Sequence, residues 1–246
     1  MNIITSKANN VVKKAKKLHH KKYRKDSYLI EGWHLFEEAV SSGAELIRIF
    51  ALAEYAEQLA DFSLVIFVSS EILADLADSK TPQGIVAEVA FERKEIPLEL
   101  SGRYLFLEDV QDPGNVGTII RTADAAGFDG VFISSASADI YNLKTLRSMQ
   151  GSHFHLPVYR IDTADFIRLA QSSRLPILAS TLSSTSIDYR NVDSKESFVL
   201  VMGNEGQGIS REMTEAADVL VHISMKGQAE SLNVAVAAGI LIFHLS

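Results

Sequence analysis

The chain has 246 residues, no cysteine and a formal net charge of −7 at neutral pH. This length allows one large or two modest domains. The lack of cysteine excludes disulfides, thiolate metal sites and cysteine nucleophiles, and it suits a reducing cytoplasm. The N-terminal decapeptide has no apolar signal core, and no run of about 18 uncharged apolar residues occurs, so we expect neither a secretory signal nor a membrane span.

The first 25 residues hold nine of the 24 basic residues and no acidic residue, so the remainder of the chain carries a net charge of −16. Asn9–His20 places Val11, Val12, Ala15 and Leu18 at helical spacing, which predicts a helix with a lysine-rich outer face. This asymmetry favours a basic patch that binds nucleic acid. A solvated amphipathic helix is the open alternative.

Alternating short strands and helices follow up to residue 92, and they predict a small α/β/α domain over residues 1–92. Gly32–Ser42 is predicted to be a helix with Leu35, Ala39 and Val40 inward, and Ser70 is predicted to cap a helix over Glu71–Ala77. The predicted strands are Tyr28–Glu31, Ile47–Ala51, Leu64–Val68 and Ile85–Ala90. Residues 93–103, with Pro97 and Gly102, are predicted to be a linker.

Residues 104–246 predict a second α/β domain, in which apolar strands alternate with helices. The predicted strands are Tyr104–Leu107, Gly130–Ser134, Leu156–Tyr159, Ile177–Thr181, Phe198–Met202 and Val219–Ile223. The predicted helices are Val116–Ala126, Asn142–Met149, Thr163–Gln171, Ile209–Ala216 and Ser231–Phe243. In such sheets ligands bind beyond the carboxyl ends of the strands.

Three polar segments follow strands of this second domain: Glu108–Phe128, Met202–Gly208 and Lys226–Asn233. In the first, Pro113–Gly114–Asn115 reads as a turn and Arg121 lies in the helix after it, so Asn115 and Arg121 are expected to face one pocket. The segment is neither a G-x-G-x-x-G fingerprint nor a P-loop. A plain turn residue for Asn115 and a surface residue for Arg121 are the alternatives.

The second and third segments each supply candidate polar groups. Glu205 lies among three glycines in MGNEGQG, where it is expected to bind a cation or an arginine, or to be a solvated loop acid. Ser231 is a natural cap for the last helix, and Asn233 lies in its first turn beside free N–H groups. That helix is apolar on every side, so we expect it to be threaded into the core.

Metal binding is not expected. His19–His20 and His153–His155 have no acidic or cysteine partner at ligand spacing.

The segments PGNVGTIIRTADAAG, LVMGNEGQG and ESLNVAVAAG resemble motifs one, two and three of the SpoU/TrmH family in the SPOUT superfamily, the RNA ribose 2′-O-methyltransferases. Lys144, Arg147 and Gly151 resemble the family's linking region, and the N-terminal stretch resembles its substrate-binding domain. The chain departs from the family at Ser224, where a proline usually precedes Met225.

The resemblance implies a C-terminal trefoil-knotted methyltransferase domain, S-adenosylmethionine as the cofactor, RNA as the substrate and a cytoplasmic homodimer. It implies that Arg121, Asn115, Glu205, Ser231 and Asn233 form the catalytic site. It implies cofactor contacts at Thr181, Leu182, Met202, Gly203, Asn204, Gly208, Ile223, Met225 and Leu232. RNA is expected at Lys13, Lys14, Lys17, Lys21, Lys22, Tyr23 and Arg24.

The family pattern places removal of the hydroxyl proton near Arg121. Because a guanidinium stays protonated, we expect Arg121 to bind the adjacent phosphate bidentately and to orient the ribose hydroxyl. Two other functions stay open: a non-catalytic RNA-binding protein that keeps the fold, and a methyltransferase of small molecules. The complete set of polar motif residues argues against the first, and the basic N-terminus argues against the second.

Overall fold

The structure is a computed structural model that describes residues 2–79, 81–92 and 94–246. The chain divides into two compact units, Met1–Arg93 with Asp139–Phe154, and Lys94–Ala138 with His155–Ser246. The predicted second domain, 104–246, thus lends one segment, 139–154, to the first unit. Arg93, the first residue of the predicted linker, lies outside the described residues.

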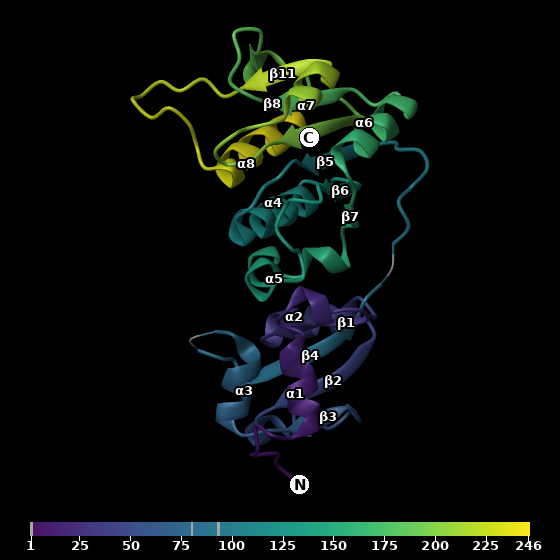
Figure 1. Ribbon diagram of the computed structural model, residues 1–246, viewed down its shortest axis with the longest axis vertical. Coiled ribbons are helices and arrows are strands. Elements are labelled where there is room, and N and C mark those ends of the chain that lie inside the picture. Colours follow the sequence, from purple (N-terminus) through teal and green to yellow (C-terminus); the bar gives the residue numbers. More distant parts are fainter. Residues whose placement is uncertain (1, 80, 93) are drawn as a thin grey trace. The chain divides into compact units, whose positions relative to one another are not determined.

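The first unit contains a four-stranded sheet in the order β1-β4-β2-β3 (Figure 1). β4 pairs antiparallel with β1 and β2, and β3 runs parallel to β2. The strands are β1 (Ser27–Glu31), β2 (Leu46–Ala51), β3 (Val65–Phe67) and β4 (Ile85–Ala90). The helices are α1 (Asn10–Lys17), α2 (Trp33–Ser41), α3 (Ser70–Ala77) and α5 (Leu143–Met149), with short 3₁₀ turns η1 (Lys21–Tyr23), η2 (Ala53–Tyr55) and η3 (Ser152–Phe154).

Helix α1 forms where its sequence places a cap and an apolar stripe. The Asn9 side chain accepts a 2.8 Å hydrogen bond from the Val11 amide, and Val12 and Ala15 are buried. Both residues lie on one helical face, so the lysines between them stay in solvent. The predicted helix over the basic segment is confirmed.

Two details of the predicted helices in this unit are wrong. Val40 is 41% exposed, and Phe36 is buried in its place beside Leu35 and Ala39. The reason is angular: a residue directly after Ala39 is rotated about 100° from it around the helix. Helix α3 begins one residue earlier than expected, so Ser69 rather than Ser70 occupies the N-cap position.

The second unit contains a seven-stranded sheet in the order β7-β6-β5-β10-β8-β11-β9, and its described pairings are parallel. Its strands are β5 (Arg103–Leu107), β6 (Gly130–Ile133), β7 (Val158–Arg160), β8 (Ile177–Ser180), β9 (Ile187–Asp188), β10 (Phe198–Met202) and β11 (Val219–His222). Its helices are α4 (Pro113–Ala125), α6 (Thr163–Ser172), α7 (Arg211–Ala216) and α8 (Val234–Leu245), with a 3₁₀ turn η4 (Tyr189–Asn191). Because the strands are parallel, the loops at their carboxyl ends lie along one edge.

Helices cover both faces of this sheet. On one face Phe106 stacks on Phe166 of α6 with ring centroids 4.1 Å apart, and Met213 of α7 belongs to the same cluster. Helix α4 packs against α8 elsewhere in the unit, where a Cβ added to Gly239 would lie 4.0 Å from Thr122 Cγ2. The sheet is therefore buried on both sides, which explains its nearly continuous apolar strands.

The last helix is not buried all round, as its apolar sequence suggested. Ala238, Leu241, Ile242 and Leu245 are buried, whereas Val236 and Phe243 are 52% and 61% exposed. One face of α8 thus packs into its own unit and the other remains apolar and open. In the described part of the chain, no helix is both long and apolar enough to cross a bilayer.

Candidate active site

The three polar segments follow the carboxyl ends of β5 and β10 and the loop after β11, so the parallel sheet brings them to one edge. β10 is the middle strand of the seven, β5 pairs with it, and β11 lies next to the edge strand β9. Loops that are far apart in the chain therefore become neighbours on a rigid support.

The first segment differs from its predicted form at one point. Pro113, Gly114 and Asn115 are the first turn of α4 and not a turn before it. Asp112 is the N-cap, and its Oδ1 accepts a 2.9 Å hydrogen bond from the Asn115 amide. Proline is favoured at the first helical position because its missing N–H has no partner there anyway.

The second segment is a closed turn. Asn204 and Gly208 exchange two backbone hydrogen bonds of 2.9 Å, and Gly208 has φ +70°. A Cβ on Gly203 would lie 2.3 Å from the carbonyl carbon of Gly208 and 2.4 Å from the amide nitrogen of Ile209. Glycine is required at 203 because the chain's own backbone occupies that space.

Glu205 links the second segment to the first. Its Oε2 accepts from the Gln111 amide at 3.1 Å, and its Oε1 accepts from the Asp112 amide at 3.0 Å and from Asn115 Nδ2 at 3.1 Å. Burial by itself raises the pKa of Glu205, but these hydrogen bonds outweigh it and hold the pKa below its usual value. Glu205 therefore serves as an anionic anchor for the loop before α4; its described hydrogen bonds involve no arginine.

Asn115 also connects the first segment to the third. Asn233 Nδ2 donates to Asn115 Oδ1 at 3.0 Å, and Asn233 Oδ1 accepts from the amides of Ala235 and Val236 at the start of α8. Asn233 is thus the cap of this helix, in place of the predicted Ser231, which is exposed two residues earlier. Glu205, Asn115 and Asn233 form one polar chain, called the motif relay below, that joins all three segments.

Arg121 lies further along α4 and is exposed. Among the residues that the structure describes, its guanidinium has neither a hydrogen bond nor an ion pair. The expected fixation of Arg121 by the other four polar residues is not seen, because Glu205 binds Asn115 and backbone amides in its place.

The residues expected to meet the cofactor lie in the loops at the same edge of the sheet. Leu182, 68% exposed, follows β8, and Leu232, 37% exposed, lies just before α8. Met202 and Gly203 are buried at the end of β10, and Thr181, Asn204, Ile223 and Met225 are half-buried. Figure 1 shows the segment between β11 and α8 as an extended loop that stands away from the sheet. With Gly208, which is exposed, the sheet groups all nine positions, whereas their contacts with a ligand stay a prediction.

Family models match two regions of the chain: the SpoU rRNA Methylase family over residues 102–243 and the MRM3-like substrate binding domain over residues 9–87. The chain belongs to the SpoU rRNA methylase family. Over its full length it is 39% identical to the 23S rRNA (guanosine(2553)-2′-O)-methyltransferase RlmP of Bacillus subtilis, of which the match covers 99%.

Two solved SpoU-type structures resemble the whole chain. The AdoMet-bound rRNA methyltransferase from Sinorhizobium meliloti has a TM-score of 0.89 and 34% identity, with 99% of this chain and 97% of that chain covered. The SpoU methyltransferase AviRb from Streptomyces viridochromogenes, in complex with AdoMet, has a TM-score of 0.83 and 26% identity, with 96% and 97% covered. The fold is therefore that of a SpoU methylase joined to a substrate-binding domain.

The first unit of this SpoU protein presents most of the predicted RNA-binding residues to solvent. Tyr23 is 44% exposed, and the ammonium groups of Lys17 and Lys22 lie 5.5 and 5.0 Å from its ring centroid. The remaining exposed lysines of the predicted set are Lys13, Lys14 and Lys21. A ring flanked by ammonium groups combines a stacking surface with phosphate neutralisation.

Arg24 is the exception, and its assignment to RNA is corrected. Its side chain is only 4% exposed, and its guanidinium donates to the Asp139 carboxylate and to the Tyr141 carbonyl within the first unit. Both partners are more than 100 residues away in the sequence, so the local pattern of basic residues could not reveal them. Arg24 holds the 139–154 segment in place.

One further residue of the site was missed. Glu108, directly after β5, is 3% exposed, and its Oε2 accepts from the Ser210 amide at 2.8 Å. Asn204 Nδ2 donates to the Asp109 carbonyl at 2.8 Å. An acidic residue directly after an apolar strand was the available signal for Glu108.

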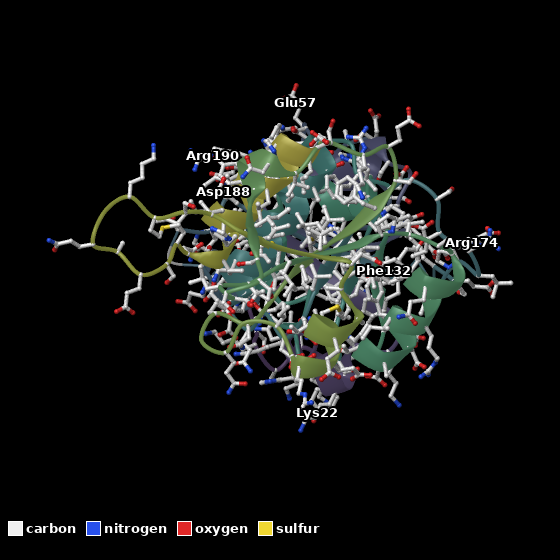
Figure 2. The ribbon with its side chains drawn as sticks, turned by 90° about the horizontal axis from the view of Figure 1, so that it is seen from above. Lys22, Glu57, Phe132, Arg174, Asp188 and Arg190 are labelled. Atoms are coloured by element: carbon white, nitrogen blue, oxygen red, sulfur yellow. The ribbon has the colours of Figure 1, made fainter. Side chains whose placement is uncertain are left out.

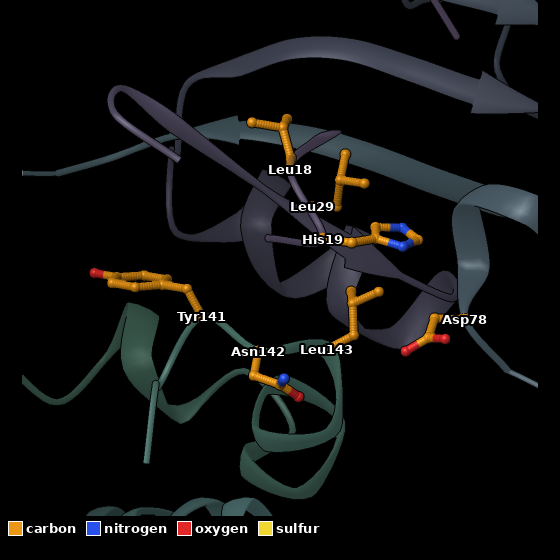
Figure 3. A pocket seen from close by; sticks show the side chains of 7 residues that line it. All are labelled: Leu18, His19, Leu29, Asp78, Tyr141, Asn142 and Leu143. Atoms are coloured by element: carbon orange, nitrogen blue, oxygen red, sulfur yellow. The ribbon is translucent and has the colours of Figure 1, made fainter. Parts of the chain in front are cut away.

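The first unit contains a small recess (Figure 3). It is lined by Leu18, His19, Leu29, Asp78, Tyr141, Asn142 and Leu143. His19 Nε2 already bonds the Leu76 carbonyl at 2.9 Å, and Asn142 caps α5. The described residues include no group of three or more His, Cys, Asp or Glu that could hold a metal.

Proposed function

We propose that this protein is an S-adenosylmethionine-dependent methyltransferase that modifies a ribose 2′-hydroxyl of RNA. The motif relay carries the proposal, since Glu205, Asn115 and Asn233 join the three family motifs at the carboxyl edge of one parallel sheet. Ribosomal RNA is the favoured substrate over transfer RNA because RlmP, 39% identical over the whole chain, is named for 23S rRNA. We place the reaction in the cytoplasm.

The loops of the second unit fit this cofactor. Leu182 and Leu232 offer exposed apolar side chains, and Gly203 and Ile223 offer backbone next to them in the fold. When bound, S-adenosylmethionine supplies an activated methyl group, so the protein needs mainly to position the hydroxyl. Thr181, Leu182, Met202, Gly203, Asn204, Gly208, Ile223, Met225 and Leu232 would hold the cofactor.

Arg121 is the residue proposed to orient the substrate. Its side chain is exposed and unpaired among the described residues, and a guanidinium matches a phosphate with two parallel hydrogen bonds. It would fix the phosphate beside the reacting ribose, while Ser231, exposed before the cap of α8, would contact the ribose. The motif relay would hold these three loops in fixed positions relative to one another.

RNA would reach the protein through the lysine-rich helix α1 and the Tyr23 turn. Only RNA carries the 2′-hydroxyl, so substrate choice and chemistry agree. Counterion release makes such binding weaken steeply with salt.

We further propose a homodimer and a trefoil-knotted second unit. The open apolar face of α8, with Val236 and Phe243, supports the dimer because an isolated protomer would leave this surface in water. The knot is proposed from the resemblance to the SpoU family.

The proposal is tested by mapping ribose methylation in ribosomal and transfer RNA from cells with and without the gene. One 2′-O-methyl group should disappear and should return when the parent gene is supplied, but not when the Arg121→Ala gene is supplied. An unchanged methylation map would reject the proposed activity and favour a non-catalytic RNA-binding protein.

A further inference from the structure

His222, the last residue of β11, lies between two loops of the candidate site. Its Nδ1 is 3.0 Å from the Ser186 hydroxyl in the loop after β8, and its Nε2 is 3.2 Å from the Ser224 hydroxyl at the start of the loop after β11. These two loops carry four positions expected to meet the cofactor: Thr181, Leu182, Ile223 and Met225. One side chain thus ties two cofactor loops together.

Asp188 of the edge strand β9 completes this arrangement. It is the register partner of His222, and its carboxylate accepts from the Ser224 hydroxyl. Arg190 also donates to it from the backbone amide at 3.0 Å, from Nε at 2.8 Å and from Nη2 at 2.9 Å. Figure 2 shows Asp188 and Arg190 next to each other. These four hydrogen bonds satisfy the acceptor sites of the carboxylate, so Asp188 is held in place and in turn holds the Ser224 side chain.

Both serine hydroxyls already have an acceptor for their own hydrogen. Ser224 donates to Asp188, and Ser186 donates to the Ser183 carbonyl at 2.7 Å. Each hydroxyl oxygen can therefore also accept a hydrogen bond from the imidazole ring of His222.

We propose that Ser224, His222 and Asp188 form a positioning anchor for the loop after β11, and that this anchor strengthens binding of the methyl donor. The inference rests on the proposed function. The Ser224 hydroxyl fixes one end of this loop, and Asn233 fixes its other end.

The charges around the ring are few. β8 carries no titratable side chain, β9 supplies Asp188, and η4 supplies Tyr189 and Arg190. The loop itself carries Lys226 and Glu230. Hydrogen bonds from Arg190 and then from Ser224 hold the pKa of Asp188 far below its usual range.

The test is calorimetric titration of the full chain with S-adenosylmethionine. Ser224→Ala should weaken binding about 3- to 10-fold, which is the effect of removing one or two hydrogen bonds. Ser224→Thr keeps the hydroxyl and should bind like the parent, as should Thr185→Ala, which removes a nearby exposed hydroxyl. The KM for the donor should rise in Ser224→Ala, with kcat and the melting temperature unchanged.

His222→Gln should weaken donor binding in the same direction as Ser224→Ala, because it removes the ring that contacts both hydroxyl groups. If the parent binds the donor and Ser224→Ala binds equally well, the anchor is rejected while the proposed function stands. If the parent does not bind the donor at all, both the anchor and the proposed cofactor are rejected.

Discussion

The two units use charged and polar groups in opposite ways. In the first unit, carboxylates are buried with arginines: Glu31, 5% exposed, pairs with Arg147 at 3.0 Å, and Glu88, 7% exposed, pairs with Arg48 at 2.6 Å. In the second unit, the motif relay runs through exposed loops and uses two amides and one carboxylate. The first arrangement holds segments together; the second arrangement aligns loops that remain accessible to ligands.

This difference indicates where function can be altered without loss of the fold. A buried ion pair becomes costly when one partner is removed, because a charge is left without compensation. A relay at the surface loses little stability when one member changes, because water replaces the partner. Substitutions in the buried ion pairs of the first unit should therefore affect folding before RNA binding, and those in the relay should affect activity before folding.

Arg147→Ala should have the largest effect on stability. Because Arg147 is 34% exposed, we expect a loss of about 2–3 kcal/mol in the free energy of unfolding, below the value for a fully buried pair. Chemical denaturation measures it. Arg211→Ala is the control, since Arg211 is 91% exposed in its pair with Glu215 and should cost less than about 0.5 kcal/mol. Equal losses in the two variants would contradict the comparison.

The same variant should be sensitive to pH. Burial raises the pKa of Glu31 above its ordinary value, and the hydrogen bonds from Ser79 and Arg147 and the charge of Arg147 oppose this. Removing Arg147 raises that pKa further, so folding takes up a proton and stability falls as pH rises through the folded pKa. The deficit of Arg147→Ala should be smaller at about pH 4 than at pH 7. A deficit independent of pH would contradict the assignment to Glu31.

Gly203→Ala should disturb the second motif by backbone overlap. The new Cβ would lie 2.3 Å from the Gly208 carbonyl carbon, so the turn must shift; the expected loss is about 1–3 kcal/mol together with weakened donor binding. Gly206→Ala is the matched control, because the nearest atom to its Cβ, Asn204 Oδ1, is 3.6 Å away. Similar melting temperatures for the two variants would refute the close backbone approach at Gly203.

Asn115→Asp should reduce methylation far more than stability. It replaces the amide that donates to Glu205 by a second carboxylate, at a cost of about 1 kcal/mol in stability. Adding Glu205→Gln restores a donor opposite the new acid, so the double variant should recover part of the activity. Initial rates on RNA measure the coupling, and strictly additive effects would argue against a continuous relay.

Lys22→Ala should have the smallest effect. Its exposed ammonium lies over Tyr23, so stability should be unchanged and RNA affinity should fall a few-fold. The slope of log affinity against log salt should decrease by about 0.7–0.9 for each RNA phosphate that the lysine no longer neutralises. Lys195→Ala, an exposed lysine of the second unit, is the control. Equal slopes for the parent and Lys22→Ala would remove this lysine from the RNA-binding face.

Local patterns predicted the order of strands and helices well, because apolar spacing determines which face of each element is buried. The strands from β5 to β11 were anticipated, except for β9, which has only two residues, Ile187 and Asp188. The start of α8 was misplaced because Ser231 and Asn233 both satisfy the rules for a cap. Only the contact of Asn233 with Asn115 distinguishes them.

What the sequence could not predict depends on partners far along the chain. Arg24 resembles its lysine neighbours in the sequence, and only the fold brings Asp139 beside it. Glu205 was expected to bind a cation or an arginine, but its carboxylate accepts hydrogen bonds from the backbone amides of Gln111 and Asp112. The exposure of Val236 and Phe243 could not be predicted either. An all-apolar helix has no hydrophobic periodicity that would indicate which of its faces is exposed.

The most direct test of the account is methyl transfer to unmodified ribosomal RNA in vitro with radiolabelled S-adenosylmethionine, followed by digestion to nucleosides and mass spectrometry. The account predicts label in a single 2′-O-methylated nucleoside with the parent protein, and none with Arg121→Ala that still binds RNA. Label on a base, or undiminished ribose methylation by Arg121→Ala, would contradict it.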